Sequence, residues 1–171
     1  MRQVGAVVHC SETSTFGFRG ERVAMPYKAI VVGTDGSSRA TVAVNEAFDL
    51  ARMAGATVHA VHAIHPAVAV GFLDAVTTQV EVDRMREEVE AIRERTVAEG
   101  QRLGVPVKFH TPGSSDAADA LIKIAEEVDA DLVVVGNRGM SGVTRFVLGS
   151  VPNKVSHHCP CSVLIVNTAA G

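Results

Sequence analysis

Residues 131–150 read DLVVVGNRGMSGVTRFVLGS, and this stretch decides the fold. An apolar run ends at Gly136, Gly139 follows after two residues, and Gly149 and Ser150 follow after nine more. A short β-branched run that glycine bounds is typical of a buried strand. Glycines let backbone N–H groups approach a ligand closely, and a helix N-terminus favours an anion. The stretch therefore predicts a strand, a phosphate-binding loop and a helix.

The rest of the chain repeats this alternation. Apolar runs predict strands at 28–33, 57–64, 105–110, 130–136 and 161–167. Helical spacing and capping residues predict helices at 38–54, 77–104, 116–128 and 144–157. Strands that alternate with helices imply right-handed crossovers and a parallel sheet that is covered on both faces. We therefore predict an α/β fold, with an open, Rossmann-like, five-stranded parallel sheet and helices on both faces.

Composition excludes several classes of protein. The chain has 171 residues, of which 16 are basic and 19 acidic, and its net charge is −3 at pH 7. This balance argues against a nucleic-acid-binding protein and against a protein that binds anionic membranes. No apolar run reaches the roughly 18 residues that a membrane span needs. We expect no nucleic-acid partner and no membrane partner.

Residues 1–26 mix Ser, Thr, Gly and charged residues without a sustained period. They lack the apolar segment of a secretory signal, so we expect a poorly ordered N-terminal extension ahead of a single domain at 27–168. The three cysteines, Cys10, Cys159 and Cys161, are an odd number and too few for a disulfide framework. We therefore expect a cytoplasmic protein in a reducing compartment.

The ligand site is expected where the strands end. Ligands of parallel sheets bind outside the carboxyl ends of the strands, near the point where the strand order reverses. This rule selects 33–37, 63–66 and 136–142. In the first of these turns, Asp35 either caps the following helix or accepts hydrogen bonds from a ribose.

Motifs for catalysis and metal binding are missing from the sequence. No G-x-x-x-x-G-K-[ST] loop supplies a lysine for a γ-phosphate, and GTDGS after the first strand is not the G-x-G-x-x-G of dinucleotide sites. The HHCPC run at 157–161 has poor spacing for a metal site. Arg138, Arg145 and Lys154 are the candidates to neutralise phosphate charge. We predict a phosphate-binding site without catalytic or metal-binding residues.

Residues 27–168 resemble the universal stress protein family, from KAIVVGTDGS near the start to VLGSVPNKVSHHCPCSVLIV near the end. The most specific part is Gly136-x2-Gly139-x9-Gly149-Ser150, which matches the motif of the family's ATP-binding branch. The resemblance implies the fold of the adenine nucleotide alpha hydrolases. It also implies a stress-response or regulatory protein that binds ATP.

The resemblance further implies where the nucleotide binds. Asp35 contacts adenosine through its ribose or base, and Ala63 meets the adenine ring with its backbone. The loop at 136–142 wraps the ribose and phosphates, and the start of the next helix holds phosphate oxygens. The expected nucleotide contacts are Gly33, Thr34, Asp35, Ala63, Gly136, Asn137, Arg138, Gly139, Met140, Ser141, Gly142, Gly149, Ser150 and Val151.

The nucleotide and the activity stay open at this point. The stretch from GNRGMSG to GSVPNKV also resembles family members that prefer cyclic AMP. A cyclic nucleotide carries one negative charge where ATP carries about four, so ATP needs more cation or Mg²⁺ than the loop visibly supplies. The alternatives to ATP binding are cyclic AMP binding, a slow ATPase, and a dimeric interaction protein with a vestigial nucleotide site. The resemblance implies a homodimer through the last strand, from Cys161 to Asn167.

Overall fold

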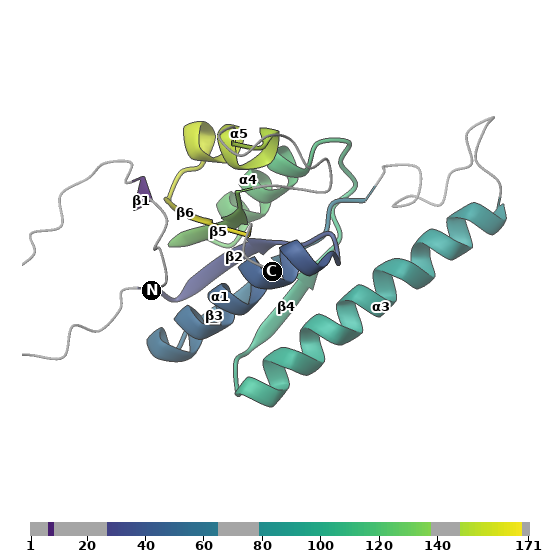
Figure 1. The fold of residues 1–171 in the computed structure, drawn as a ribbon, viewed down its shortest axis with the longest axis horizontal. Coiled ribbons are helices and arrows are strands. Elements are labelled where there is room, and N and C mark those ends of the chain that lie inside the picture. The colour runs from purple at the N-terminus through teal and green to yellow at the C-terminus, as the bar shows by residue number, and fades with distance from the viewer. Residues whose placement is uncertain (1–6, 9–26, 65–78, 138–147, 169–171) are drawn as a thin grey trace, which may run out of the picture.

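The computed structural model describes residues 7–8, 27–64, 79–137 and 148–168, which build a sheet between two layers of helices (Figure 1). The strand order is β1-β6-β5-β2-β3-β4. Strands β2 to β6 are parallel to one another, and β1 pairs antiparallel with β6. The strands are β1 (Val7–Val8), β2 (Ala29–Gly33), β3 (Thr57–Val61), β4 (Val107–His110), β5 (Leu132–Gly136) and β6 (Ser162–Val166). The predicted five-stranded parallel sheet is confirmed, with one antiparallel strand added at its edge.

The helices cover both faces of the sheet, as predicted. They are α1 (Ser38–Ala54), α3 (Gln79–Leu103), α4 (Ala117–Glu127) and α5 (Ser150–His158). Helices α1 and α3 pack on one face, and α4 and α5 pack on the other. The helix starts predicted at 77 and 144 lie outside the described residues.

Local chemistry sets the ends of α1 and α4. The hydroxyl of Ser37 accepts a hydrogen bond from the backbone N–H of Ala40 and so caps the start of α1. Helix α1 ends at Gly55, whose φ of 71° is a left-handed conformation that glycine adopts at low cost. The carboxylate of Asp116 caps α4 by accepting from the N–H groups of Ala118 and Asp119.

The strands are buried on both faces because helices cover both. In β2, Ile30 and Val32 pack toward α1, whereas Val31 packs toward α4. All three side chains are fully buried. The continuous run of β-branched residues is therefore what this position in the sheet requires.

The strand order places the ligand site. From β2 the chain crosses through α1 to β3 on one side, whereas α4 later carries it to β5 on the other side of β2. The strand order therefore reverses at β2. Outside the carboxyl ends of β2 and β5 the two crossovers diverge, which leaves a crevice at this point.

Strand β1 was not predicted, because a pair of valines is too short a run to identify a strand. Val7 pairs with Leu164, and Val8 pairs with Val163. The expectation of a poorly ordered extension over 1–26 stays a prediction, and apart from Val7 and Val8 the residues of that range lie outside the described part of the chain. Strand β1 lies on the edge of β6 through which the predicted homodimer would form.

Among the residues that the structure describes, no helix has the length and hydropathy to cross a bilayer.

Candidate functional site

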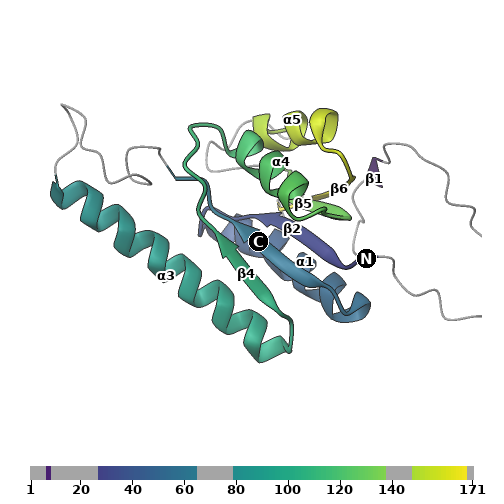
Figure 2. The same ribbon diagram turned by 180° about the vertical axis from the view of Figure 1, so that it is seen from behind.

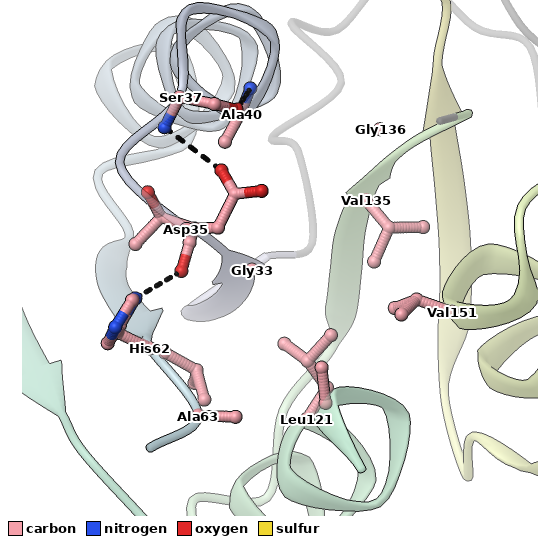
Figure 3. Close-up of a pocket in the computed structure, with 13 residues that line it drawn as sticks. Gly33, Asp35, Ser37, Ala40, His62, Ala63, Leu121, Val135, Gly136 and Val151 are labelled. Atoms are coloured by element: carbon pink, nitrogen blue, oxygen red, sulfur yellow. Dashed lines mark hydrogen bonds between the residues drawn. The ribbon is translucent and has the colours of Figure 1, made fainter. Parts of the chain in front are cut away.

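A cavity of about 150 Å³ opens at the carboxyl ends of β2, β3 and β5, beside the first turns of α1, α4 and α5 (Figure 3). It lies at the reversal of the strand order, where the sequence analysis placed the ligand. One wall is polar and comes from the turn after β2, and the opposite wall is apolar. Its described lining residues are Gly33, Thr34, Asp35, Ser37, Ala40, Val61, His62, Ala63, Ala117, Leu121, Val135, Gly136 and Val151.

The polar wall is a turn that its own side chains hold in place. The backbone N–H of Thr34 donates to the carbonyl of Val61 at 2.9 Å and ties the turn to β3. The hydroxyl of Thr34 accepts from the N–H of Gly36 at 3.2 Å. Gly36 has a φ of +76°, a conformation that favours glycine. The turn therefore has a defined shape before any ligand binds.

Asp35 is held in this turn through one oxygen of its carboxylate. Its Oδ1 accepts a hydrogen bond from the N–H of Ser37 at 3.0 Å. Figure 3 shows the other carboxylate oxygen on the side of the cavity. The cap of α1 is Ser37, so Asp35 does not cap this helix. One carboxylate oxygen of Asp35 shapes the turn before the cap, and the other stays on the side of the cavity.

The opposite wall is apolar. Figure 3 shows Val135 and Val151 facing the turn across the cavity, with Leu121 and Ala63 at one end of it. A Cβ on Gly33 would lie 3.1 Å from Cδ1 of Leu121, so a larger residue at the floor of the cavity would need Leu121 to shift by a few tenths of an ångström. This wall suits the flat, weakly polar face of an aromatic base better than a charged group.

His62 joins the turn to β3 from within the cavity wall. Its Nδ1 lies 2.9 Å from the carbonyl oxygen of Thr34. A carbonyl oxygen only accepts, so Nδ1 carries the proton and donates. This interaction orients the imidazole and fixes its tautomer.

The N-terminus of α5 adjoins the cavity. The N–H of Gly149 donates to the carbonyl of Asn137 at 3.1 Å, and Val151 in the first turn lines the cavity. Side chains cap α1 and α4, but no side chain of the described residues caps α5. Its first N–H groups and the helix dipole therefore favour an anion at this end.

Gly149 is not required by the fold of the described residues. Its φ of −61° suits any residue, and a Cβ there would meet its nearest neighbours only at 3.5 Å. The glycine was expected to give room for the backbone to approach a ligand. That explanation is left open by the structure, because no strain or clash among the described residues demands glycine.

The structure places the predicted site residues in three groups. Those that line the cavity are Gly33, Thr34, Asp35, Ala63, Gly136 and Val151. Those outside the described residues are Arg138, Gly139, Met140, Ser141 and Gly142, together with the candidate cation Arg145. Those that are described but do not line the cavity are Asn137, Gly149 and Ser150.

The Asn137 side chain is used inside the protein. Its Oδ1 accepts from the backbone N–H and the hydroxyl of Thr168, at 3.0 and 2.9 Å, and its Nδ2 donates to Asn167. These bonds tie the end of β5 to the segment after β6. The backbone is engaged as well, because the N–H of Asn137 donates to the carbonyl of Val166 at 2.8 Å and its carbonyl accepts from the N–H of Gly149 at 3.1 Å. The contact of Asn137 with nucleotide stays a prediction.

Lys154 is likewise used between helices. Its Nζ lies 2.9 Å from Asp116 Oδ2 and 2.7 Å from Asp119 Oδ1, so it clamps α5 to α4. The hydrogen bonds to Asp119 and Asp116 raise the pKa of Lys154, and its ammonium lowers the pKa of Asp116. The expectation that Lys154 neutralises a phosphate is therefore wrong for this geometry, because its charge is already paired.

Several lining residues were missed by the sequence analysis. They are Ser37, Ala40, Val61, His62, Ala117, Leu121 and Val135. Ser37 lies inside the turn 33–37 that the sequence selected but was not among the expected contacts, and His62 directly precedes the selected turn 63–66. Ala117 and Leu121 come from α4, and only the packing of α4 beside β2 brings them to the cavity.

No group of three or more His, Cys, Asp or Glu side chains is placed to hold a metal ion in the part of the chain that the structure describes. The residues of the HHCPC run do not gather around a common point.

A pair of histidines, His59 and His110, lies in the sheet, and neither lines the cavity. His59 Nδ1 and His110 Nε2 are 3.0 Å apart, and their rings stack with centroids 5.2 Å apart. His59 is 5% exposed. Burial, reinforced by His110 and Lys108, lowers the pKa of His59 to about 4, and burial also lowers the pKa of His110 against the opposing effect of Glu127. The pair is therefore neutral in the folded protein.

This pair predicts a loss of stability in mild acid. Below its usual pKa of 6.5 the unfolded His59 takes up a proton, whereas the folded one stays neutral down to about pH 4. Stability is therefore fully present above pH 6.5 and falls as the pH drops toward 4, by about 2 kcal/mol at pH 4.5. Urea unfolding at pH 7 and at pH 4.5 measures the difference.

His59→Leu should flatten this pH dependence, whereas His157→Leu, at an exposed histidine in the last turn of α5, should leave it intact. An equal slope in the wild type and the His59 variant would contradict the assignment.

The chain is similar to universal stress proteins over most of its length. A model of the universal stress protein family matches residues 26–167. The chain is 30% identical over 141 residues to a universal stress protein of Methanocaldococcus jannaschii, a match that covers 82% of each chain. A solved universal stress protein in complex with cAMP is 31% identical with a TM-score of 0.63, over 84% of this chain and 98% of that one. One from Archaeoglobus fulgidus in complex with dAMP is 25% identical with a TM-score of 0.59, over 84% and 100%.

Proposed function

The chain belongs to the universal stress protein family, and we propose that it is a cytoplasmic stress-response or regulatory protein that binds an adenine nucleotide in the cavity at the ends of β2, β3 and β5. One observation carries this proposal. One cavity brings together an apolar wall, a carboxylate directed inward, and the neighbouring N-terminus of α5, which no side chain of the described residues caps. These three features match the base, the ribose and the phosphate of a nucleotide.

The base would lie against the apolar wall. Leu121, Val135 and Val151 present methyl groups to the cavity, and Ala63 lies at its end with a small side chain that lets a ring approach the backbone. Apolar lining with a few placed polar groups is the usual composition of a small-molecule site. The contact between adenine and the Ala63 backbone remains the expectation that the family resemblance implies.

The ribose would bind Asp35. One oxygen of this carboxylate is fixed by Ser37, so the second is oriented before the ligand arrives. Hydrogen bonds from hydroxyl groups to a carboxylate are stronger than bonds between neutral groups. A preorganised acceptor also loses little entropy on binding.

The phosphate would lie at the start of α5. No Lys or Arg is among the described residues that line the cavity, and Lys154 is paired with two aspartates. A helix N-terminus neutralises about half a charge, which suits one phosphate better than three. The universal stress proteins solved with cAMP and with dAMP each hold a ligand with a single phosphate. We therefore expect cyclic AMP and AMP to bind at least as tightly as ATP. ATP is the nucleotide that the glycine motif predicts, and it would need Mg²⁺ to bind at this site.

Two substitutions at Gly149 test this arrangement. Gly149→Ala should leave the free energy of unfolding within about 0.5 kcal/mol of the wild type, because the new Cβ meets only ordinary contacts. It should weaken binding of cyclic AMP by about tenfold, or 1.4 kcal/mol, because the methyl group occupies space next to the phosphate. Gly149→Val should weaken the binding of cyclic AMP further. Thermal unfolding with and without cyclic AMP reports both quantities.

Unchanged affinity in a stable Gly149→Val protein would remove the start of α5 from the site. It would leave the apolar wall and Asp35 as the remaining basis for nucleotide binding.

We also propose that two copies associate through the last strand, Cys161 to Asn167. Strand β1 covers this edge at Val163 and Leu164 in the single chain. In the part of the chain that the structure describes, two residue pairs hold β1 there, and a second copy that offers its whole edge strand would pair more extensively. Association would therefore displace β1 from β6.

A further inference from the structure

Two cysteines lie together where α5 ends and β6 is about to begin. Cys159 and Cys161 flank Pro160, and their Sγ atoms are 3.5 Å apart. Neither lines the nucleotide cavity. We propose that Cys159 and Cys161 are a peroxide-sensitive dithiol that closes reversibly to a disulfide across Pro160.

The backbone already brings the two sulfurs near bonding distance. A disulfide needs an S–S distance of about 2.05 Å, so closure asks for roughly 1.5 Å of side-chain movement. The N–H of Cys159 donates to the carbonyl of Val155 at 2.9 Å, which fixes this residue at the end of α5. Pro160 has a restricted φ and limits how far the two residues can separate.

The surroundings select a small oxidant. Cys159 is 8% exposed and packs with Val155 and Val163 in the core between the sheet and α4 and α5, whereas Cys161 is half-buried. A bulky disulfide such as oxidised glutathione would have difficulty reaching the Cys159 sulfur. Hydrogen peroxide is close to water in size and needs only a small opening.

The two thiols differ in reactivity because the hydrogen bond between their sulfurs shifts their pKa values in opposite directions. The hydrogen bond from the Cys161 S–H lowers the pKa of Cys159 to about 7, and the same bond raises the pKa of Cys161. The thiolate is the reactive form of a cysteine. We therefore assign Cys159 as the thiol that attacks peroxide, and Cys161, whose sulfur lies 3.5 Å away, as the resolving thiol.

The reaction balances in two steps. The Cys159 thiolate attacks one peroxide oxygen, the O–O bond breaks, and with one proton the products are a Cys159 sulfenic acid and water. The Cys161 sulfur then attacks the Cys159 sulfur, the S–O bond breaks, and its hydroxide takes the Cys161 proton and leaves as a second water. Both sulfurs are oxidised by one electron each, and peroxide takes up the two electrons.

A disulfide between Cys159 and Cys161 spans a single residue, and we expect a reductant to open it again. Disulfides stabilise chiefly by closing long loops of the unfolded chain, and this loop is very short. A dithiol reductant should therefore restore both thiols. The consequence is a thiol pair that responds to peroxide at the junction between the nucleotide-binding helix and the last strand.

The test uses the full chain with Cys10→Ser, which leaves only this pair. After treatment with one equivalent of hydrogen peroxide, we expect the intact mass to fall by two hydrogen atoms, the free thiols of the denatured protein to disappear, and a peptide map to join Cys159 to Cys161. Dithiothreitol should reverse all three changes. Addition of oxygen atoms without loss of two hydrogens, or unchanged thiols, would overturn the proposal.

Cys161→Ser is the matched control, because its half-buried site accepts a hydroxyl without a buried cavity. This variant should retain a Cys159 sulfenic acid that a dimedone probe labels, whereas the parent with both cysteines should show little label. Equal labelling of the two proteins would show that Cys161 does not resolve the sulfenic acid. Thiols of the parent that resist peroxide until a chelator is added would show that the pair holds a metal ion instead, and would also overturn the proposal.

Discussion

Replacing Asp35 with alanine is expected to weaken the binding of cyclic AMP or AMP by roughly 30- to 100-fold, or about 2 to 3 kcal/mol. The substitution removes the carboxylate oxygen that faces the cavity, together with the charge that strengthens its bonds to ribose hydroxyls. It also removes the acceptor for the Ser37 N–H, so the turn loses part of its order. Isothermal titration of the wild type and the variant measures the change in affinity.

Two further variants separate charge from geometry. Asp35→Asn keeps an oxygen that can accept from Ser37, so it should preserve the turn and lose only about tenfold in affinity. Asp49→Ala removes an aspartate of α1 that is paired at the surface with Arg52, and it should bind like the wild type. If Asp35→Ala bound as tightly as Asp49→Ala, Asp35 would serve only as a turn residue.

Gly100→Ala is expected to lower the free energy of unfolding by about 2 to 3 kcal/mol. Helix α3 lies alongside β4 (Figure 2), and Gly100 lies against Val107 of that strand. A Cβ there would overlap Cγ2 of Val107 and lie 3.1 Å from the carbonyl oxygen of Val105, which is backbone and cannot move aside alone. This clash outweighs the gain of about 1 kcal/mol that alanine brings to a helix interior.

The loss should appear in urea unfolding and as a fall of several degrees in Tm. Gly149→Ala is the matched control, because it is the same substitution at a site with room for a methyl group. A Gly100→Ala protein as stable as the wild type would mean that α3 does not pack against β4 as closely as described.

The sequence predicted the sheet because each parallel strand carries its own signal. The buried run AIVVG of β2 is β-branched and ends at a glycine, and the helix after it lies between its caps Ser37 and Gly55, as the capping chemistry of these residues predicts. The alternation of strands and helices then restricts the topology. Strand β1 carries no such signal, since two residues show neither period nor boundary.

The cavity was predicted only in part, for a similar reason. Residues at strand ends, such as Asp35 and Gly136, can be placed by the rule for parallel sheets. Leu121 reaches the cavity from α4, and this depends on the angle at which a helix packs, which the sequence does not state. The partners of Asn137 and Lys154 are also tertiary, because they join segments that lie tens of residues apart.

Isothermal titration of the full chain with cyclic AMP, with AMP, and with ATP and Mg²⁺ tests nucleotide binding most directly. We expect saturable binding at one site per chain, with the monophosphates at least as tight as ATP, and a rise in Tm that follows RT ln(1 + [L]/Kd). The absence of both heat and a shift in Tm with every adenine nucleotide at millimolar concentration would contradict the account.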